Sequence, residues 1–312
     1  MNDFDNRVFV IDKHGGPTSF DVVDAFRAAT GIRRVGHAGT LDPLARGVLL
    51  LCSGAATRVV EHFVDLGKWY EFEVRLGEGT ATLDAEGEVT ERVACPEIPR
   101  EELLSAAASF VGECVLDPPA YSAIKKNGKR LYELARAGET PKVEGKRVRI
   151  YSLEITAVDL PAVSFRLNCS RGTYVRSLAR DFGARFGLPA HIRNLVRTAV
   201  GPFRVEDGFP GSLLFERKLE GLRGIALPDA LGFLPGIVVS DGARRGLMNG
   251  VLPGPADVVR TLGLKGDERA IRILDEGGGL LAVGTRTEGS ARNRLAWVDS
   301  YRLLVDTGRS TR

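Results

Sequence analysis

The chain has 312 residues, of which 44% are hydrophobic and 27% charged, as is typical of a soluble globular protein. It shows no apolar run near the roughly 20 residues that span a bilayer, and its first residues lack the pattern of a signal peptide. The four cysteines and four histidines are scattered without the spacing of a metal site or a disulfide framework. We therefore expect a reduced, cytoplasmic protein of about two domains, with no metal, no other cofactor and no membrane contact.

The net charge of +3 conceals an uneven distribution. Residues 118–150 hold nine Lys or Arg against three Glu, and residues 166–204 hold eight Arg against Asp181 alone, whereas residues 65–101 are acidic. This asymmetry indicates a basic face for a polyanion, since phosphate neutralisation supplies most non-specific nucleic-acid affinity. The alternative is a solvated surface whose charges balance in the fold. Aromatic residues and histidine within both basic segments favour nucleic acid.

The first predicted elements are a strand at residues 8–11 and a helix from Ser19, its expected N-cap, to Gly31, its expected C-terminal stop. Residues 34–47 follow, a loop with three glycines in which Asp42 stands among two arginines and a histidine. Such a loop ahead of an apolar strand suits a functional site. From the residues alone an Asp-Pro turn is an equally good explanation.

Further along, residues 57–66 are predicted to form a helix, and residues 68–77 alternate apolar with charged side chains, as a half-buried strand does. Residues 99–111 predict a helix with Leu103, Leu104, Ala107, Phe110 and Val111 inward. The apolar phase shifts within residues 147–158, which predicts a strand with a bulge.

The second half of the chain continues with a strand at residues 163–169 and a helix opened by residues 170–178, with Val175, Leu178, Ala179, Phe182 and Phe186 inward. Residues 208–236 are rich in Gly and Pro and are expected to be an irregular linker. Short apolar runs between glycines then predict a small β-rich domain at residues 237–312.

Five segments of the chain resemble motifs of the TruB family of RNA pseudouridine synthases. Residues 36–47 resemble the signature GH-x-G-x-LDP-x-A-x-G, and the others resemble a K-x-Y strand (68–70), PP-x-YSA-x-K (118–125), C-S-x-GTY-x-R-x-L (169–178) and L-x-R-T-x-x-G-x-F (195–203). Two loops depart from the family pattern, because His14 replaces a proline and Ala81 replaces an aspartate.

The resemblance implies an α+β pseudouridine synthase fold, with a mixed, largely antiparallel sheet flanked by helices and a small C-terminal β-rich PUA-like domain. The implied domains are a catalytic domain at 1–208 with an RNA-binding thumb at 118–150, a linker at 209–236 and a PUA-like RNA-binding domain at 237–312. The implied activity is isomerisation of uridine to pseudouridine in the T-loop of tRNA, at position 55 in tRNA numbering.

The resemblance also implies roles for single residues. Asp42 would be the catalytic carboxylate, Arg176 its ion-pair partner, and Tyr70 the aromatic ring that stacks on the target base. The remaining substrate-binding or RNA-binding residues would be His37, Lys13, Lys68, Tyr121, Lys125, Lys129, Arg130, Tyr174, Leu195 and Arg197. The reaction needs no metal, and we expect none.

Three other functions were weighed. A non-catalytic RNA-binding protein or tRNA-folding chaperone would need Asp42 or Arg176 to be lost, and both are present. A glycosidase-like hydrolase needs a second carboxylate, for which Asp181 is the only candidate within the matched motifs. A guide-RNA-dependent synthase is disfavoured by the long basic insertion after the YSA-x-K segment. We expect a monomer that binds the T-stem-loop of tRNA without a protein partner.

Overall fold

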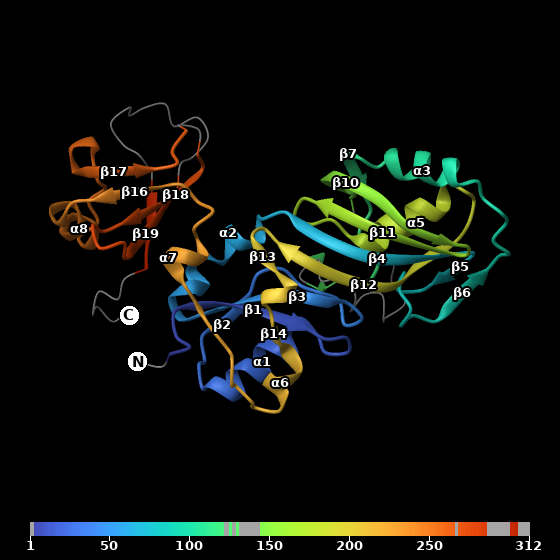
Figure 1. Cartoon of the computed structure of the whole chain (residues 1–312), viewed down its shortest axis with the longest axis horizontal. Coiled ribbons are helices and arrows are strands. Elements are labelled where there is room, and N and C mark those ends of the chain that lie inside the picture. The colour runs from blue at the N-terminus through green and yellow to red at the C-terminus, as the bar shows by residue number, and fades with distance from the viewer. Residues whose placement is uncertain are drawn as a thin grey trace.

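A computed structural model describes residues 3–121, 144–265, 268–285 and 300–304, and also the backbone of residues 125–126 and 129–130 (Figure 1). Its main feature is an 11-stranded sheet in which two pairings, β1 with β14 and β3 with β12, are parallel and the others antiparallel. The strands along the sheet are β14 (Phe209–Pro210), β1 (Arg7–Lys13), β3 (Arg46–Ser53), β12 (Ala190–Val200), β4 (Lys68–Leu76), β11 (Ala162–Cys169), β10 (Lys146–Asp159) and β7 (Gly112–Leu116). Three short strands, β2 (Val35–His37), β13 (Phe203–Arg204) and β15 (Ile225–Ala226), pair with β3, β12 and β1. The predicted mixed, largely antiparallel sheet is confirmed.

The first helix, α1 (Ser19–Thr30), ends as predicted at Gly31, whose φ of 76° is left-handed. Its N-cap is Thr18 and not Ser19, because Thr18 forms a reciprocal capping box with Asp21. The buried Ser19 hydroxyl instead accepts from the backbone N–H of Leu41 at 2.8 Å and contacts its carbonyl oxygen at 3.1 Å. Ser19 therefore ties the start of α1 to the loop that carries Asp42.

Two further helices, α3 (Arg100–Ala108) and α5 (Val175–Ala184), pack on one face of the sheet (Figure 1). The helix expected at 57–66 is reduced to α2 (Val60–Val64), which follows a 3-10 turn at residues 54–59. In α3 the expected inward face is partly wrong, because Leu104 is 44% exposed, as is Val111 just beyond the helix at 48%. The buried face of α3 carries Leu103 and Ala107, one turn apart, and Leu104 points away from it. Val111 lies beyond the end of the helix.

The strand predictions hold in detail. Tyr70, Phe72, Val74 and Leu76 on β4 are all buried, which is the alternation that the sequence indicated. Strand β10 contains two register shifts against β11, so the predicted bulge is present. Residues 209–236 are less irregular than expected, because β14, α6 (Gly211–Phe215), β15 and α7 (Leu227–Ala230) lie there and both strands pair with β1.

The C-terminal part is a five-stranded sheet with the order β17 (Val258–Leu262), β16 (Gly236–Val239), β18 (Ala270–Leu274), β19 (Leu280–Thr285) and β20 (Ser300–Leu303), accompanied by α8 (Asp241–Met248). This is the expected small β-rich domain. It contacts the larger sheet region through Arg58, which donates to the Leu303 carbonyl at 3.0 Å, and through an Arg302–Glu61 ion pair at 2.9 Å. Across the described residues, no helix is both long and apolar enough to cross a membrane.

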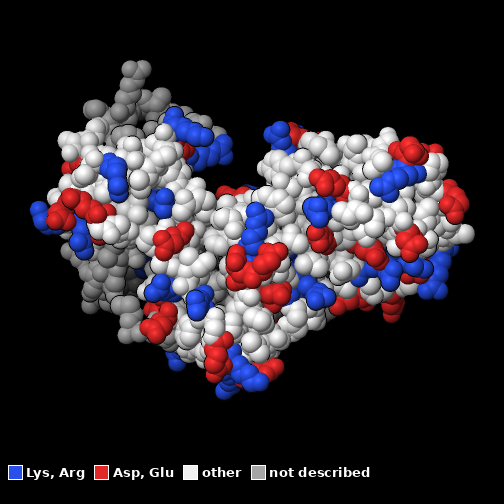
Figure 2. All heavy atoms as spheres, in the orientation of Figure 1, with Lys and Arg blue, Asp and Glu red and all other residues white. Residues whose placement is uncertain are grey.

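The surface shows where the uneven charge of the sequence falls. On the face seen in Figure 2, basic and acidic side chains alternate over both lobes, so the described residues form no continuous basic surface there. More than half of the basic segment 118–150, the expected thumb, lies outside the described residues. Those described are its two ends, 118–121 and 144–150, and the backbone of two short paired strands, β8 (Lys125–Lys126) and β9 (Lys129–Arg130). The cations that matter for the site are inside a pocket, described next.

Candidate active site

The loop between β2 and β3 carries Asp42 and is held from below by Lys13. The Lys13 ammonium donates to the carbonyl oxygens of Asp42 at 3.2 Å, Pro43 at 3.0 Å and Ala45 at 2.7 Å, and also to that of His14 at 3.0 Å. The side chain has no exposed surface, and burial lowers its pKa to about 8. Lys13 was expected to bind RNA. With its donors turned to backbone carbonyls, it instead holds the loop in place.

Arg197 on β12 holds the same loop from a second side. Its guanidinium donates to the carbonyl oxygens of Val48 at 2.7 Å, Gly39 at 3.0 Å and Thr40 at 3.4 Å, and it is 1% exposed. The neighbouring Gly47 has a φ of +95°, and a Cβ there would lie 2.3 Å from the Arg197 carbonyl oxygen. Only glycine fits where β3 meets β12. Arg197, expected to bind RNA, therefore donates to the backbone of this loop and of β3.

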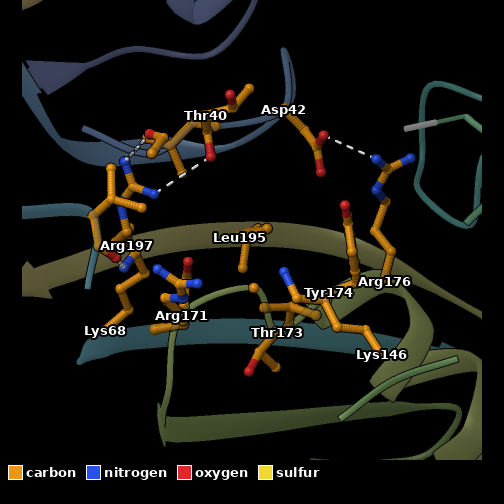
Figure 3. Close-up of a pocket in the computed structure, with 16 residues that line it drawn as sticks. Thr40, Asp42, Lys68, Lys146, Arg171, Thr173, Tyr174, Arg176, Leu195 and Arg197 are labelled. Atoms are coloured by element: carbon orange, nitrogen blue, oxygen red, sulfur yellow. Dashed lines mark hydrogen bonds and ion pairs between the residues drawn. The ribbon is translucent and has the colours of Figure 1, made fainter. Parts of the chain in front are cut away.

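Asp42 and Arg176, predicted to pair, lie together at one end of a pocket (Figure 3). Arg176 Nη2 donates to Asp42 Oδ1 at 2.9 Å and to the Tyr121 carbonyl oxygen at 2.9 Å, while Nη1 donates to the Thr82 carbonyl oxygen at 2.8 Å. The Arg176 side chain is 7% exposed and that of Asp42 34%. A buried guanidinium fixed on three sides thus presents one partly accessible carboxylate to the pocket.

A second carboxylate, Asp84, was missed from the sequence. Its Oδ2 lies 3.5 Å from Arg176 Nη1, and its side chain is 7% exposed. Oδ1 accepts from the Thr82 hydroxyl at 2.5 Å and from the Glu86 backbone N–H at 3.2 Å. Asp181, the second acid considered from the sequence, does not line the pocket and pairs with Arg180 at 2.7 Å. The second carboxylate near Arg176 is therefore Asp84. The signal was available, because Asp84 keeps its place in the loop where Ala81 departs from the family pattern.

The electrostatic balance at Asp42 is set by its neighbours. Burial raises the pKa of Asp42, the charge of Arg176 opposes that rise, and the nearby Asp84 carboxylate adds to it. Asp42 therefore depends on Arg176 to stay ionised. Glu86 is close enough to these carboxylates for its pKa to be affected, since burial and the charge of Asp84 raise it as well.

The pocket has a volume of about 450 Å³, within the range of ligand sites. Tyr70, Tyr174 and Leu195, all expected to contact the substrate, line it together with Asp42 and Arg176. Lys68 lines it too, but its ammonium donates to the carbonyl oxygens of Val64 at 2.9 Å and Leu66 at 2.8 Å, and burial lowers its pKa to about 8. Two further cations line the pocket: Lys146, from the end of the expected thumb segment, and Arg171, to which no role was assigned from the sequence.

The remaining expected residues lie elsewhere. His37 is on β2 and does not line this pocket; its Nδ1 atom is buried and has no hydrogen-bond partner within the described part of the chain. Tyr121 contributes its backbone carbonyl to Arg176. The side chains of Lys125, Lys129 and Arg130 lie outside the described residues. Among the residues that the structure describes, no group of three or more His, Cys, Asp or Glu is placed to hold a metal ion.

Comparison with solved structures defines the class of protein. A chain in the crystal structure of a Cbf5–Nop10–Gar1 complex superposes with a TM-score of 0.74, covering 98% of this chain and 87% of that chain at 24% identity. At this identity the likeness concerns the fold alone. The chain therefore has the fold of that protein, and its pocket holds a carboxylate and guanidinium pair.

Comparison with protein families and curated proteins narrows the class. The TruB family pseudouridylate synthase (N terminal domain) matches residues 27–175. The tRNA pseudouridine synthase B of Clostridium tetani is 40% identical over 248 residues, 79% of this chain and 85% of that protein. That of Thermotoga maritima is 40% identical over 286 residues, 91% of each chain. This chain belongs to the TruB family of pseudouridylate synthases, and it is an isomerase, as the motifs predicted.

Proposed function

We propose that this isomerase converts a uridine in the T-loop of tRNA, at position 55 in tRNA numbering, to pseudouridine. The relatives from Clostridium tetani and Thermotoga maritima carry the name tRNA pseudouridine synthase B, which supports tRNA as the substrate. The choice of the T-loop rests on the motif resemblance. The observation that carries the chemistry is the 2.9 Å Arg176–Asp42 ion pair in a pocket lined by two tyrosines.

The reaction breaks the bond between uracil N1 and ribose C1′, turns the uracil, and forms a bond from its C5 to C1′; the C5 proton is lost and N1 gains one. A single carboxylate suffices, unlike the two that hydrolyse ordinary glycosides. Asp42 would either attack C1′ or remove the C2′ proton. Both roles need the ionised form, which the charge of Arg176 favours.

The target base has to leave the RNA stack to reach Asp42, which costs a few kcal/mol of unstacking. Stacking on an aromatic ring returns about 1–3 kcal/mol per base. Tyr70 and Tyr174 both line the pocket beside Asp42 and Leu195, and they would receive the flipped uracil. The pocket is therefore suited to a flat base whose sugar faces the carboxylate.

Two other functions make different predictions. A guide-RNA-dependent synthase is less well supported, because the relatives at 40% identity carry the name tRNA pseudouridine synthase B, whereas the chain of the Cbf5–Nop10–Gar1 complex matches at 24% identity. A non-catalytic RNA-binding protein or folding chaperone would have no need for Asp42 held against a buried guanidinium. We propose a cytoplasmic monomer that needs no guide RNA and no protein partner.

The test is pseudouridine formation on an unmodified T-stem-loop RNA by the purified chain alone, beside Asp42→Asn, with RNA binding measured in parallel. Conversion by wild type, none by the variant and equal binding by both would support the proposal. Binding without conversion by the wild type would refute it for this substrate. Conversion that starts only when a guide RNA is added would favour the guide-dependent alternative.

A further inference from the structure

The wall of the pocket that faces Asp42 is cationic, and not all of its charge is accounted for. Lys68, Lys146, Arg171 and Arg197 all line the pocket. Lys68 and Arg197 are engaged with backbone carbonyls and are buried. Lys146 and Arg171 are exposed and hold neither the Asp42 loop nor Asp42 itself. Their charge is available for a ligand.

Lys146 is fixed at its backbone and free at its tip. It is the first residue of β10 and pairs with Leu116 of β7. Its ammonium makes no hydrogen bond or ion pair with the residues that the structure describes. The side chain lies over Gly172, where a Cβ would be 2.2 Å from Nζ and 2.6 Å from Cε. Glycine at that position, with a φ of +79°, leaves Lys146 its path into the pocket (Figure 3).

Arg171 stands on the same wall, one residue before Gly172. Its partner is Asp65, and the two side chains are 59% and 56% exposed. An ion pair this exposed contributes little to stability, so a stronger anion can replace the carboxylate at small cost. The guanidinium has five N–H donors in a planar fork, which matches two oxygens of a phosphate.

We propose that Lys146 and Arg171 bind the backbone phosphates on either side of the flipped uridine and so set which way its ribose faces. This inference rests on the proposed function. Charge is distributed unevenly in the pocket, because Asp42 is the one described carboxylate that lines it, whereas Lys146 and Arg171 line it as exposed cations. A nucleotide carries a neutral base and anionic phosphates, so only one orientation avoids placing phosphate against carboxylate. That orientation leaves the sugar facing Asp42.

Lys146 and Arg171 are thus positioning residues, and the test separates them from general basic charge. Lys146→Gln and Arg171→Gln are each compared with Arg223→Gln, which removes an exposed arginine that lies outside the expected thumb and does not line the pocket. Loss of a charged phosphate contact should raise KM for the T-stem-loop RNA about 10-fold with little change in kcat. Arg223→Gln should stay near wild type, and Lys146→Arg should restore KM.

A second measurement identifies the contact. T-stem-loop RNAs with a single neutral methylphosphonate at each phosphate flanking the target uridine are assayed with wild type and Lys146→Gln. The inference predicts one phosphate whose neutralisation raises KM for wild type but not for the variant, and a second one with the same behaviour toward Arg171→Gln. Equal losses in all variants would overturn it, as would equal KM values for Lys146→Gln and Arg223→Gln. If wild type converts no T-stem-loop uridine, the proposed function itself fails, and the two failures are therefore distinguishable.

Discussion

The loop that carries Asp42 is bound by cations of two kinds, those that contact its backbone and the one that contacts the Asp42 side chain. Lys13 and Arg197 donate to main-chain carbonyl oxygens and are almost fully buried. Arg176 instead donates to the Asp42 carboxylate itself. The first two fix where the loop lies, because they bind groups that every residue has. The third fixes the charge of one side chain.

The difference has a measurable consequence. Removing Lys13 or Arg197 should lower the free energy of unfolding, since buried carbonyl oxygens lose their donors. Removing Arg176 or the Asp42 carboxylate should lower the rate of pseudouridine formation, with a smaller effect on the free energy of unfolding. Variants of both kinds of cation therefore test whether stability and catalysis are divided between them, and the largest effect on catalysis is expected at Asp42 itself.

The largest effect is expected for Asp42→Asn. The amide has nearly the same shape and keeps the loop, whose contacts run through backbone carbonyls, but it can neither attack C1′ nor take a proton. We expect single-turnover pseudouridine formation to fall by about 10²–10⁴-fold or more, with Tm within a few degrees of wild type. A variant that loses its fold instead would show that the carboxylate is structural.

Arg176→Gln should come next, with a rate lower by about 10²–10³-fold, the usual cost of removing a donor from a developing charge. The pKa of Asp42 is raised by burial and lowered by Arg176, so losing the guanidinium raises it further. The ionised, active form then requires a higher pH. The acid limb of the rate should move to higher pH than in wild type, measured in single-turnover assays across pH 4–8.

Much of this arrangement was predictable from the chain, for identifiable reasons. The alternation in β4 and the phase shift in β10 report burial directly, and both were confirmed. Asp42 and Arg176 are 134 residues apart, and only the family motifs linked them. From the residues alone, Asp42 was as well explained by a turn.

What could not be predicted has physical causes too. Lys13 was assigned to RNA from the family resemblance, and nothing local in the sequence reveals the four carbonyl oxygens that accept from its ammonium. Lys146 can enter the pocket because Gly172 has no side chain, and this packing relation joins segments that are far apart in the sequence. Asp84 lies in a loop that resembles the family pattern, but nothing local in the sequence reveals that it comes within 3.5 Å of Arg176.

Asp84→Asn is expected to have the third effect. Its charge adds to the rise in the pKa of Asp42, so neutralising it lowers that pKa and shifts the acid limb to lower pH, opposite to Arg176→Gln. The rate on the plateau should fall about 10-fold, because Arg176 loses a charged neighbour at 3.5 Å. Asp181→Asn is the matched control, since that carboxylate pairs with Arg180 instead. Shifts in the same direction for Arg176→Gln and Asp84→Asn would contradict this account.

Lys13→Met should affect catalysis least and stability most. Methionine keeps the length of the side chain but leaves four buried carbonyl oxygens without their donor, for which we expect a loss of about 2–4 kcal/mol in the free energy of unfolding. Urea denaturation measures this loss. The control is Lys218→Met, because Lys218 is 63% exposed and pairs with Glu216, which is also exposed. Its free energy of unfolding should stay within about 0.5 kcal/mol of wild type. At a temperature where Lys13→Met is still folded, Arg197 and Ser19 continue to hold the loop, so the rate should fall far less than in Arg176→Gln. A stable Lys13→Met protein that cannot form pseudouridine would reverse the assignment and return Lys13 to the substrate.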